Sequence, residues 1–599
     1  MNFTFSDTIA GRVVGYERAG KILRLRTVDD REFAVSLAGS PSAELLRNLG
    51  EPYIDASGHL EDMLEPGRFL FAYGIFYPGG RFDAKRLIFL GRRGGAARFE
   101  ESSWWISQLK EIASFYRKAQ FGDGPVDYTE YRTNIRLGGE KTSSHRQETD
   151  TISRLVYGMA TAYLLSGEDA YLEVAERGTE YLRKQMRFVD VEEDVVYWYH
   201  GVSIDGDREK KLFTSEFSDD YDAIPMYEQI YALAGPVQTY RVTADPRIKK
   251  DADATLRLFE RFFLDHQHGG YFSHIDPIML SFEHESLGPN LARKNWNSVG
   301  DHAPAYLINL YLATGERRYA DFLESTFDTI VERFPDDKNS PFVQERFHRD
   351  WTPDTTHGWQ QNRAVVGHNL KIAWNLMRMN SLRPKAAYSD LAAHIARTMP
   401  AVGSDRQRGG WYDVLERTRE EDIGGHAFVW HDRKAWWQQE QAILAYLILA
   451  GVTGEESYLA EARTAESFYN AFFLDHDEGA VYFNVLANGL PYLLGTERLK
   501  GSHSMSMYHS AELCYLAAVY NNLLINGSPL DLHFQPDPSD VPRRILRVSP
   551  DLLPPGRVRV AEAEVDGEPY KDFDAEALTV RLPDVSRRVR VKVRLEVTR

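Results

Sequence analysis

Titratable and polar side chains recur at one distance before a short turn that the chain repeats. The turn carries Gly or Ala after Ser or Thr, at Gly167, Ala244, Gly315 and Gly454. Counting thirteen residues back from these positions reaches Arg154, Tyr231, His302 and Gln441, which follows Glu440. The spacing places these side chains at one level of successive predicted helices.

A degenerate unit near Ser381 lies between the last two of these turns. Counting thirteen residues back from Ser381 reaches His368. Anchoring the count on Tyr388, which follows this turn as Tyr171, Tyr319 and Tyr458 follow three others, reaches Lys371 instead. His368 and Lys371 are one helical turn apart on the same face, so both are candidates for the site.

These residue types suit proton movement on a sugar. Two histidines can exchange protons with opposite faces of a substrate near neutral pH, and an arginine can stabilise the oxyanion that forms. The set favours proton abstraction next to a sugar carbonyl. Tryptophans that could stack on a sugar ring are Trp359, Trp374, Trp436 and Trp437.

Two less specific interpretations compete with this one. A single histidine on a helix is more often a packing residue, but each unpaired buried polar group costs about 1–3 kcal/mol, so a ring of them favours a ligand site. Inverting glycoside hydrolysis would need two carboxylates roughly 6.5–9.5 Å apart. Glu440 with Asp301 or Asp432 would have to supply them.

The elements that must position these residues lie between about residues 100 and 527. The repeated turn is followed by a helical pattern and then by an irregular segment that often carries Gly-Gly and an aromatic, with a period of about 70 residues. Six helical hairpins would fill this region and can close into an (α/α)6 toroid. We therefore predict a mainly α protein in which the polar level lies at the mouth of the toroid.

The sequence patterns of the N-terminal and C-terminal regions predict β-strands. We predict a small, possibly OB-like, β-barrel domain over residues 1–98, the helical catalytic domain over 99–528 and a small β-sandwich-like domain over 529–599. Alternating runs such as 22–26 and 578–582 support the strands.

Composition excludes several classes of protein. The 599 residues include one cysteine, Cys514, so a disulfide framework and a cysteine-based zinc site are excluded, and we predict a packing role for it. A formal net charge of −17 argues against nucleic-acid binding. No apolar run approaches about 20 residues, and no secretory signal is visible, so we predict a cytoplasmic protein that does not enter membranes.

Residues 265–284 carry four histidines, His266, His268, His274 and His284, which invite a metal-site interpretation. The equivalent loop at 475–479 lacks the further histidines. We therefore predict a turn element and no metal.

Five motifs in order make residues 104–525 resemble the N-acylglucosamine 2-epimerase family, which includes cellobiose 2-epimerases and aldose–ketose isomerases. Residues 154–163 are similar to its first inner helix, whose Arg contacts the sugar. His302 matches another active-site His. The other motifs are Gly367-His368-x-x-Lys371-x-x-Trp374, Lys434-x-Trp436-Trp437-x-x-Glu440, and Lys500-Gly501-Ser-His503 with Tyr508-His509.

The resemblance implies a sugar 2-epimerase or an aldose–ketose isomerase that needs no cofactor. His368 and His509 would exchange protons next to the carbonyl of a ring-opened sugar, with His503 as the alternative to His509, and Arg154 would stabilise the enediolate. Further substrate-binding candidates are Tyr157, Trp359, Lys371, Trp374, Trp436, Trp437, Glu440 and Gln441.

Two positions depart from the family pattern. Lys371 stands where the family has a Glu that supports the His, which leaves two interpretations open: a cation that neutralises an anionic substrate, or a changed reaction. Gln441 occupies the Glu position of the tryptophan motif, because Glu440 lies one residue early. A glycoside hydrolase on the same toroid and a non-catalytic sugar-binding protein stay open as alternatives, and a homodimer is possible.

Overall fold

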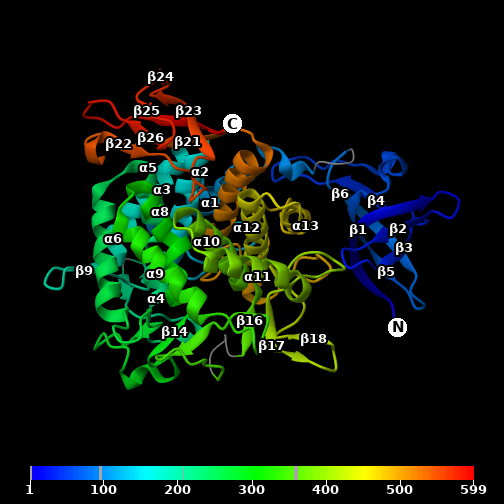
Figure 1. Ribbon diagram of the computed structural model, residues 1–599, viewed down its shortest axis with the longest axis horizontal. Coiled ribbons are helices and arrows are strands. Elements are labelled where there is room, and N and C mark those ends of the chain that lie inside the picture. The colour runs from blue at the N-terminus through cyan, green and yellow to red at the C-terminus, as the bar shows by residue number, and fades with distance from the viewer. Residues whose placement is uncertain (1–2, 93–96, 207, 357–361, 599) are drawn as a thin grey trace.

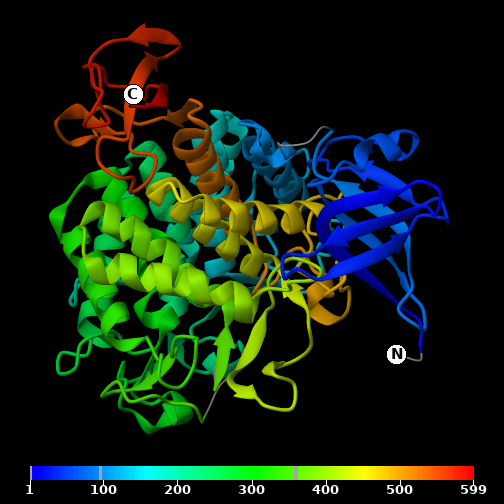
Figure 2. The same cartoon turned by 45° about the vertical axis from the view of Figure 1, so that its right-hand side comes forward.

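The computed structural model describes residues 3–92, 97–206, 208–356 and 362–598. Strands fill the N-terminal part, helices the middle and strands again the C-terminal part (Figure 1). The two strand regions lie against different sides of the helical part, with the N-terminal strands beside the helices drawn in yellow (Figure 2). Among the described residues, no helix is long and apolar enough to cross a membrane.

Five N-terminal strands close into a ring. β1 pairs with β2 and β5, β2 with β3, β5 with β6, and β3 meets β6 in parallel, while β4 adds to the outer side of β6. Leu23 and Leu25 point into the barrel core, whereas Arg24 and Arg26 are exposed, as alternation requires. The bounds are β1 Phe5–Glu17, β2 Ile22–Arg26, β3 Glu32–Ser36, β4 Ser42–Leu45, β5 Phe69–Phe76 and β6 Phe82–Phe89.

In the described part of the middle region, five pairs of consecutive helices are each joined by a short turn, and a sixth pair combines the last helix with the first, which it contacts. The first helix of four pairs ends at Gly167, Ala244, Gly315 or Gly454, each in the left-handed conformation with φ between 57° and 76°. Glycine adopts this conformation without strain, which explains its recurrence in the turn. The pairs are α2 Thr149–Ser166 with α3 Asp169–Tyr181, α4 Met226–Ala232 and α5 Ala234–Thr243 with α6 Pro246–Leu258, α8 Ile308–Thr314 with α9 Arg317–Arg333, α10 Val366–Leu382 with α11 Ala386–Gly403, α12 Trp436–Thr453 with α13 Glu456–Phe472, and α14 Tyr508–Val519 with α1 Trp104–Phe121.

The first helices of these pairs are buried on nearly all sides. α2 packs against α5 and α14, α5 against α8, α10 against α12, and α12 against α14. The second helices keep an exposed polar face. The short helix α7, Trp296–Val299, and a π-helical turn, Ala303–Leu307, precede α8, and Pro304, which lacks a backbone N–H, lies inside that turn.

Short strands lead directly into the first helices. Each pairs with a strand of a following loop, so the helix starts are tied together at one end of the helical region. The pairs are β7 Arg146–Glu148 with β10 Gly201–Asp205, β12 Ile224–Pro225 with β13 His274–Ile275, β14 Arg293–Asn295 with β15 Arg346–His348, β16 Arg363–Val365 with β17 Val414–Glu420, and β19 Lys434–Ala435 with β20 Asn484–Val485. The further strands here are β8 Arg187–Asp190, β9 Val195–Trp198, β11 Arg208–Leu212 and β18 Gly425–Phe428.

Three of these loops each contain a buried lysine–aspartate ion pair that holds the loop in place. The Nζ atom of Lys294, Lys434 and Lys500 lies 2.8, 3.0 and 2.8 Å from the Oδ2 atom of Asp265, Asp405 and Asp475. Each lysine also donates to a glycine carbonyl at 2.7 Å, that of Gly269, Gly409 and Gly479.

Asp265 also accepts hydrogen bonds from the backbone N–H groups of Gln267 and His268. The prediction of a turn element over this histidine-rich segment is therefore confirmed.

The C-terminal strands form two sheets that lie over the ends of the first helices remote from their starts. Arg378, near the end of α10, bonds Asp551 through both carboxylate oxygens, with Nε at 3.0 and 2.9 Å. The first sheet holds β21 Leu530–Phe534, β27 Val591–Val597, β23 Val558–Val565 and β24 Glu568–Tyr570; the second holds β22 Ile545–Arg547, β26 Thr579–Arg581 and β25 Phe573–Asp574.

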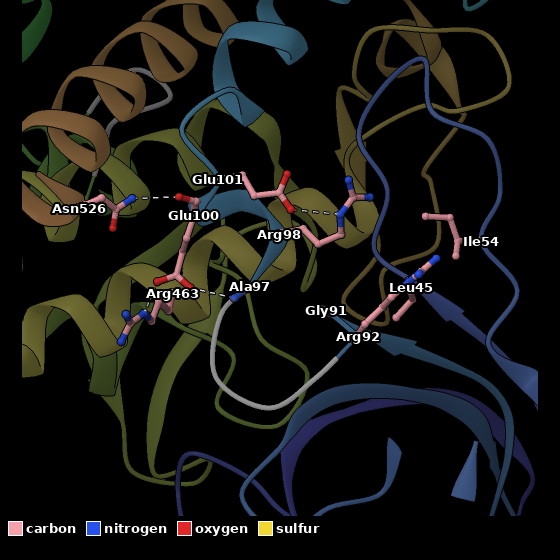
Figure 3. A pocket seen from close by; sticks show the side chains of 10 residues that line it. All are labelled: Leu45, Ile54, Gly91, Arg92, Ala97, Arg98, Glu100, Glu101, Arg463 and Asn526. Atoms are coloured by element: carbon pink, nitrogen blue, oxygen red, sulfur yellow. Dashed lines mark hydrogen bonds and ion pairs between the residues drawn. The ribbon is translucent and has the colours of Figure 1, made fainter. Parts of the chain in front are cut away.

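The junction between the N-terminal barrel and the helices contains a pocket of about 800 Å³. Arg98 and Glu100 lie on its wall near Arg463 of α13, with an Arg463–Glu100 ion pair at 2.7 Å (Figure 3). None of the residues predicted for the site lines this pocket.

Substituting Lys434→Met tests the loop pair. The change removes the closer and fully buried cation of Asp405 and leaves only the part-exposed Arg408 at 3.3 Å, and breaking a buried pair costs about 3–5 kcal/mol. We expect the free energy of unfolding in urea to fall by about 3 kcal/mol or more. The control Lys338→Met replaces an exposed lysine. A loss of less than about 1 kcal/mol in Lys434→Met would contradict the role given to the pair.

Candidate active site

A cavity of about 350 Å³ lies at the starts of the first helices. Seven of the predicted site residues line it together: Arg154, His368, Lys371, Trp436, Trp437, His503 and His509. They come from α2, α10, α12, α14 and the loop before α14. Segments far apart in the sequence thus meet at the level that the turn spacing predicts.

His368 is held by a carboxylate from a loop. Its Nδ1 atom lies 2.6 Å from Oε2 of Glu345, and the Glu345 side chain is buried. A carboxylate on Nδ1 fixes the ring and its tautomer. The family pattern places the supporting Glu at position 371, which is Lys here. Glu345 supports His368 instead.

Lys371 is part of a buried ion pair. Its Nζ lies 2.6 Å from Oδ1 of Asp301 and 3.3 Å from the hydroxyl of Tyr231. Burial lowers the pKa of Lys371, but Asp301 and Glu512 outweigh it and raise the pKa above its usual value. Asp301 balances this charge, so the structure gives no support to the expectation that Lys371 neutralises an anionic substrate.

His509 is buried beside Glu440 of α12. Nδ1 of His509 lies 2.6 Å from Oε2 of Glu440. Burial, with Lys371 and Arg154 as neighbouring cations, lowers the pKa of His509 well below its usual value. The imidazole is therefore neutral at physiological pH and can accept a proton.

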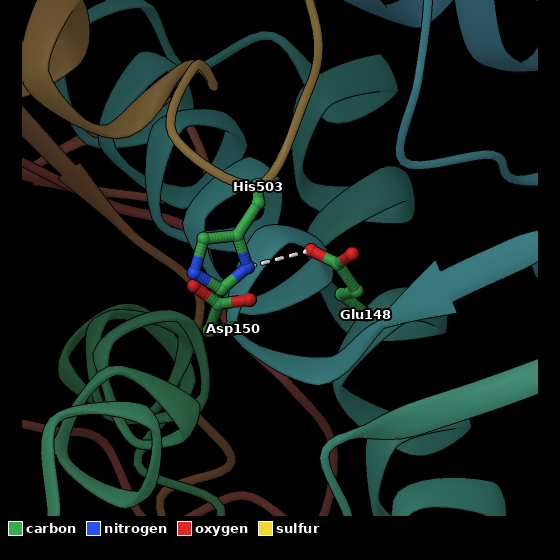
Figure 4. Close-up of side chains that lie close together, drawn as sticks. All are labelled: Glu148, Asp150 and His503. Atoms are coloured by element: carbon green, nitrogen blue, oxygen red, sulfur yellow. Dashed lines mark hydrogen bonds and ion pairs between the residues drawn. The ribbon is translucent and has the colours of Figure 1, made fainter. Parts of the chain in front are cut away.

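His503, unlike His509, is protonated at neutral pH. Its Nδ1 lies 2.9 Å from Oε2 of Glu148, and Asp150 approaches the ring as well (Figure 4). Although burial lowers it, these carboxylates raise the pKa of His503 to about 10. His503 is an imidazolium at neutral pH, a hydrogen-bond donor and not a base, and this difference favours His509 as the second proton-transfer residue.

Arg154 is held in place by aromatic rings. Its guanidinium lies 3.8 Å from the centre of the Tyr231 ring and donates to the hydroxyl of Tyr227. Its Nε lies 3.5 Å from Oδ2 of Asp150. These contacts fix a cation at the cavity wall, where it can stabilise an oxyanion.

Five other predicted residues lie outside the cavity. Tyr157 packs against Tyr508 with ring centres 4.5 Å apart. Trp374 donates from Nε1 to Gln441 at 2.9 Å, and Gln441 in turn donates to Glu440 at 2.9 Å, so these three form a layer behind the cavity wall.

His302 also lies outside the cavity, among aromatic rings that include Phe259, Tyr271 and Phe322. Burial lowers its pKa to about 3, and its Nδ1 lies 2.7 Å from the Tyr306 hydroxyl. Its neighbour Asp301 faces the cavity in its place. The remaining candidate, Trp359, lies outside the described residues.

Further residues complete the wall and were not predicted from the sequence: Tyr227 and Asn297 lie on α4 and α7, and the others lie in loops or in the short turn 218–220. Their loops fall outside the helical register on which the prediction depends, although Trp430 and Arg433 directly precede the tryptophan motif. These additional lining residues include Phe217, Ser218, Asp220, Tyr227, Asn297, Asp413, Trp430, Arg433, Phe483 and Ser504.

Each carboxylate on the described wall is held by a basic side chain. Asp301 meets Lys371, Asp220 meets Nε2 of His274 at 2.7 Å, and Asp413 accepts from Nε of Arg433 at 2.8 Å. Glu440 does not line the cavity. This arrangement does not favour the acid–base carboxylate pair that inverting hydrolysis requires.

Comparison with known proteins agrees with the helical fold of the middle region. The sequence profile of the N-acylglucosamine 2-epimerase (GlcNAc 2-epimerase) family matches residues 131–511, and the chain belongs to this family. The family and the enzyme class predicted from the sequence, a carbohydrate epimerase or isomerase, are thereby confirmed.

Individual relatives are distant. A cellobiose 2-epimerase from Bacteroides fragilis is 23% identical over 391 residues, 63% of this chain and 90% of that protein. A D-mannose isomerase from Marinomonas mediterranea is 20% identical over 61% of this chain and 84% of that protein. Among solved structures, a cellobiose 2-epimerase from Bacillus thermoamylovorans superposes with a TM-score of 0.56 at 16% identity, covering 69% of this chain and 98% of the other. This last likeness shows a shared fold.

The charge state of His503 can be measured by NMR of histidine-labelled protein. We expect its ring to stay doubly protonated through pH 8, because its pKa is about 10. Since this value exceeds the usual 6.5, the cluster stabilises the fold fully below pH 6.5, and the contribution is lost as the pH rises through about 10.

The variant Glu148→Gln removes one of the two carboxylates and should lower the pKa of His503. A wild-type His503 that loses its proton between pH 6 and 7 would contradict this charge state.

Proposed function

We propose that this protein is a sugar 2-epimerase or aldose–ketose isomerase that moves a proton next to the carbonyl of a ring-opened mono- or oligosaccharide. One observation carries the proposal: two histidines that approach a carboxylate through Nδ1 share one cavity. The ring of Trp437 lies between them, 5.3 Å from His368 and 5.9 Å from His509 between ring centres. The proposal assigns the two histidines to a single substrate carbon or to two adjacent ones.

The proposed reaction begins with opening of the sugar ring. One of His368 and His509 removes the proton next to the carbonyl, and the electron pair moves to the carbonyl oxygen. Arg154 stabilises the resulting enediolate. The other histidine returns a proton to the opposite face of the same carbon in epimerisation, or a proton reaches the neighbouring carbon in isomerisation. His503, as an imidazolium, donates a hydrogen bond to a sugar oxygen.

We further propose that the helix pairs close into an (α/α)6 toroid over residues 99–528, with separate β domains over 1–98 and 529–599. The contacts of α14 with both α2 and α12 support closure, since α14 belongs to the last pair and α2 to the first. A homodimer stays a prediction.

Two alternatives are separated from this proposal by hydrogen exchange. Candidate free sugars, beginning with mannose, glucose and cellobiose, are incubated with the enzyme in heavy water, and deuterium at C2 is followed by NMR. We expect enzyme-dependent label at C2. Release of reducing ends from oligosaccharides without label would support hydrolysis instead, and saturable binding with neither result would support a sugar-binding protein.

The two histidines should each be needed for turnover. We expect His368→Asn and His509→Asn each to lower kcat by about 10²–10⁴-fold, because each removes one proton-transfer group. His394→Asn changes a part-exposed histidine on α11 and serves as the control. Full activity in the double variant His368→Asn/His509→Asn would refute the assigned pair.

A further inference from the structure

Two buried carboxyl groups lie together behind His509. Glu440 belongs to α12, and Glu512 follows His509 by three residues on the same face of α14. One oxygen of each carboxyl group and one ring nitrogen of His509 all lie within 4.8 Å of one another. The exposed fraction of both glutamates is 2% or less. Neither glutamate lines the cavity, so neither meets the substrate.

Of the four carboxyl oxygens in this pair, two accept a hydrogen bond from the described residues and two do not. Tyr508 donates to Oε1 of Glu512 at 3.0 Å, and Gln441 donates to Oε2 of Glu440 at 2.9 Å. The other two oxygens, Oε1 of Glu440 and Oε2 of Glu512, meet no donor among the described residues. Two ionised carboxylates are both acceptors, whereas a proton between them would supply the missing donor.

The charges that face the pair cannot keep both groups ionised. Lys371 and Arg378 approach from α10, but Asp301 balances the first and Asp551 the second. The remaining titratable neighbours are neutral at physiological pH and come from α2, α4, α13 and α14: Tyr157, Tyr231, Tyr469, Tyr508 and Cys514.

Two like charges buried this closely hold one proton between them, as carboxyl pairs in other active sites do. Burial and the neighbouring Glu512 accordingly raise the pKa of Glu440 well above its usual value.

We propose that Glu440 and Glu512 share one proton and that this pair holds His509 with Nδ1–H toward Glu440 and Nε2 toward the substrate. The inference rests on the proposed function. Oε2 of Glu440 lies 2.6 Å from Nδ1 of His509, so a proton held on Nδ1 toward this oxygen leaves Nε2 unprotonated toward the cavity. With its proton, the pair carries a single negative charge. A second charge would draw a further proton onto His509 and turn the base into an imidazolium. Glu512 is thus a positioning residue.

Infrared difference spectroscopy of the unliganded enzyme tests the shared proton. Glu512→Gln and Glu440→Gln should each remove one carboxylic-acid carbonyl band, and the double variant should remove one acid band and one carboxylate band. Glu466→Gln is the reference, because burial raises the pKa of Glu466 to about 8 and this residue lies outside the site. Loss of a carboxylate band in either single variant would overturn the proposal.

Kinetics test the positioning role. Glu512→Gln keeps a donor toward Glu440, so kcat should fall by no more than about threefold. Glu512→Ala removes that donor, so the whole charge of Glu440 is directed at His509 and favours its imidazolium form, and kcat should fall by about 100-fold at pH 7, with KM changed by less than about twofold. Because the lost activity reflects a protonated His509, kcat of Glu512→Ala should rise with pH while that of wild type stays flat.

Two kinetic outcomes would overturn the positioning role of Glu512, and a separate outcome would overturn the proposed function. A pH-independent loss in Glu512→Ala, or an equal loss in Glu512→Gln while Glu466→Gln stays active, would assign Glu512 a structural role and overturn the proposal. The infrared result needs no substrate. If wild-type enzyme shows no C2 exchange with any sugar, the proposed function fails whether or not the shared proton is found.

Discussion

The cost of burying charge constrains every part of this site. Ionised side chains lose their hydration when they enter the middle of a helical protein, and only a partner of opposite charge restores the balance. The cavity wall obeys this rule throughout: Lys371 meets Asp301, His503 meets Glu148, and His368 meets Glu345. Each partner comes from another segment of the chain, so the charges of the proposed site also determine how these segments fit together.

The same cost of burying charge gives two histidines of the cavity different protonation states. His503 is surrounded by carboxylates and keeps its proton, whereas His509 is buried near Lys371 and Arg154 and stays neutral. One residue type therefore provides both a permanent donor and a base. Three loops use the same pairing for stability alone, in the buried contacts of Lys294, Lys434 and Lys500.

The repeated turn made much of the site predictable from the sequence. A glycine or alanine in the left-handed conformation ends the first helix of four pairs, and counting back from Gly167 reaches Arg154, which lines the cavity. In the degenerate unit, the count from Ser381 reaches His368, which lines it as well. The count does not give the rotation of the helix. His302 stands at this level but beside the π-helical turn that contains Pro304, and it faces outward, while Asp301 faces the cavity. Gln441 likewise lies behind the wall that Trp437 forms.

The partners of the catalytic side chains could not be found this way. Glu345 and Glu148 lie in segments that no helical register describes, and only the pairing of short strands such as β7 with β10 and β14 with β15 brings such segments to the helix starts. The Lys371 substitution illustrates the limit. The sequence suggested a free cation or an altered reaction, whereas the fold supplies Asp301 for Lys371 and Glu345 for His368.

A crystal structure with an open-chain sugar alcohol would test the central claim most directly, because such a ligand mimics the ring-opened substrate and cannot react. The account predicts that the Nε2 atoms of His368 and His509 both lie within about 3.5 Å of the C1–C2 segment, with Arg154 on the adjacent oxygens. A sugar alcohol that binds in the cavity with its C1–C2 segment away from these two histidines, for instance between carboxylates of the wall, would contradict it.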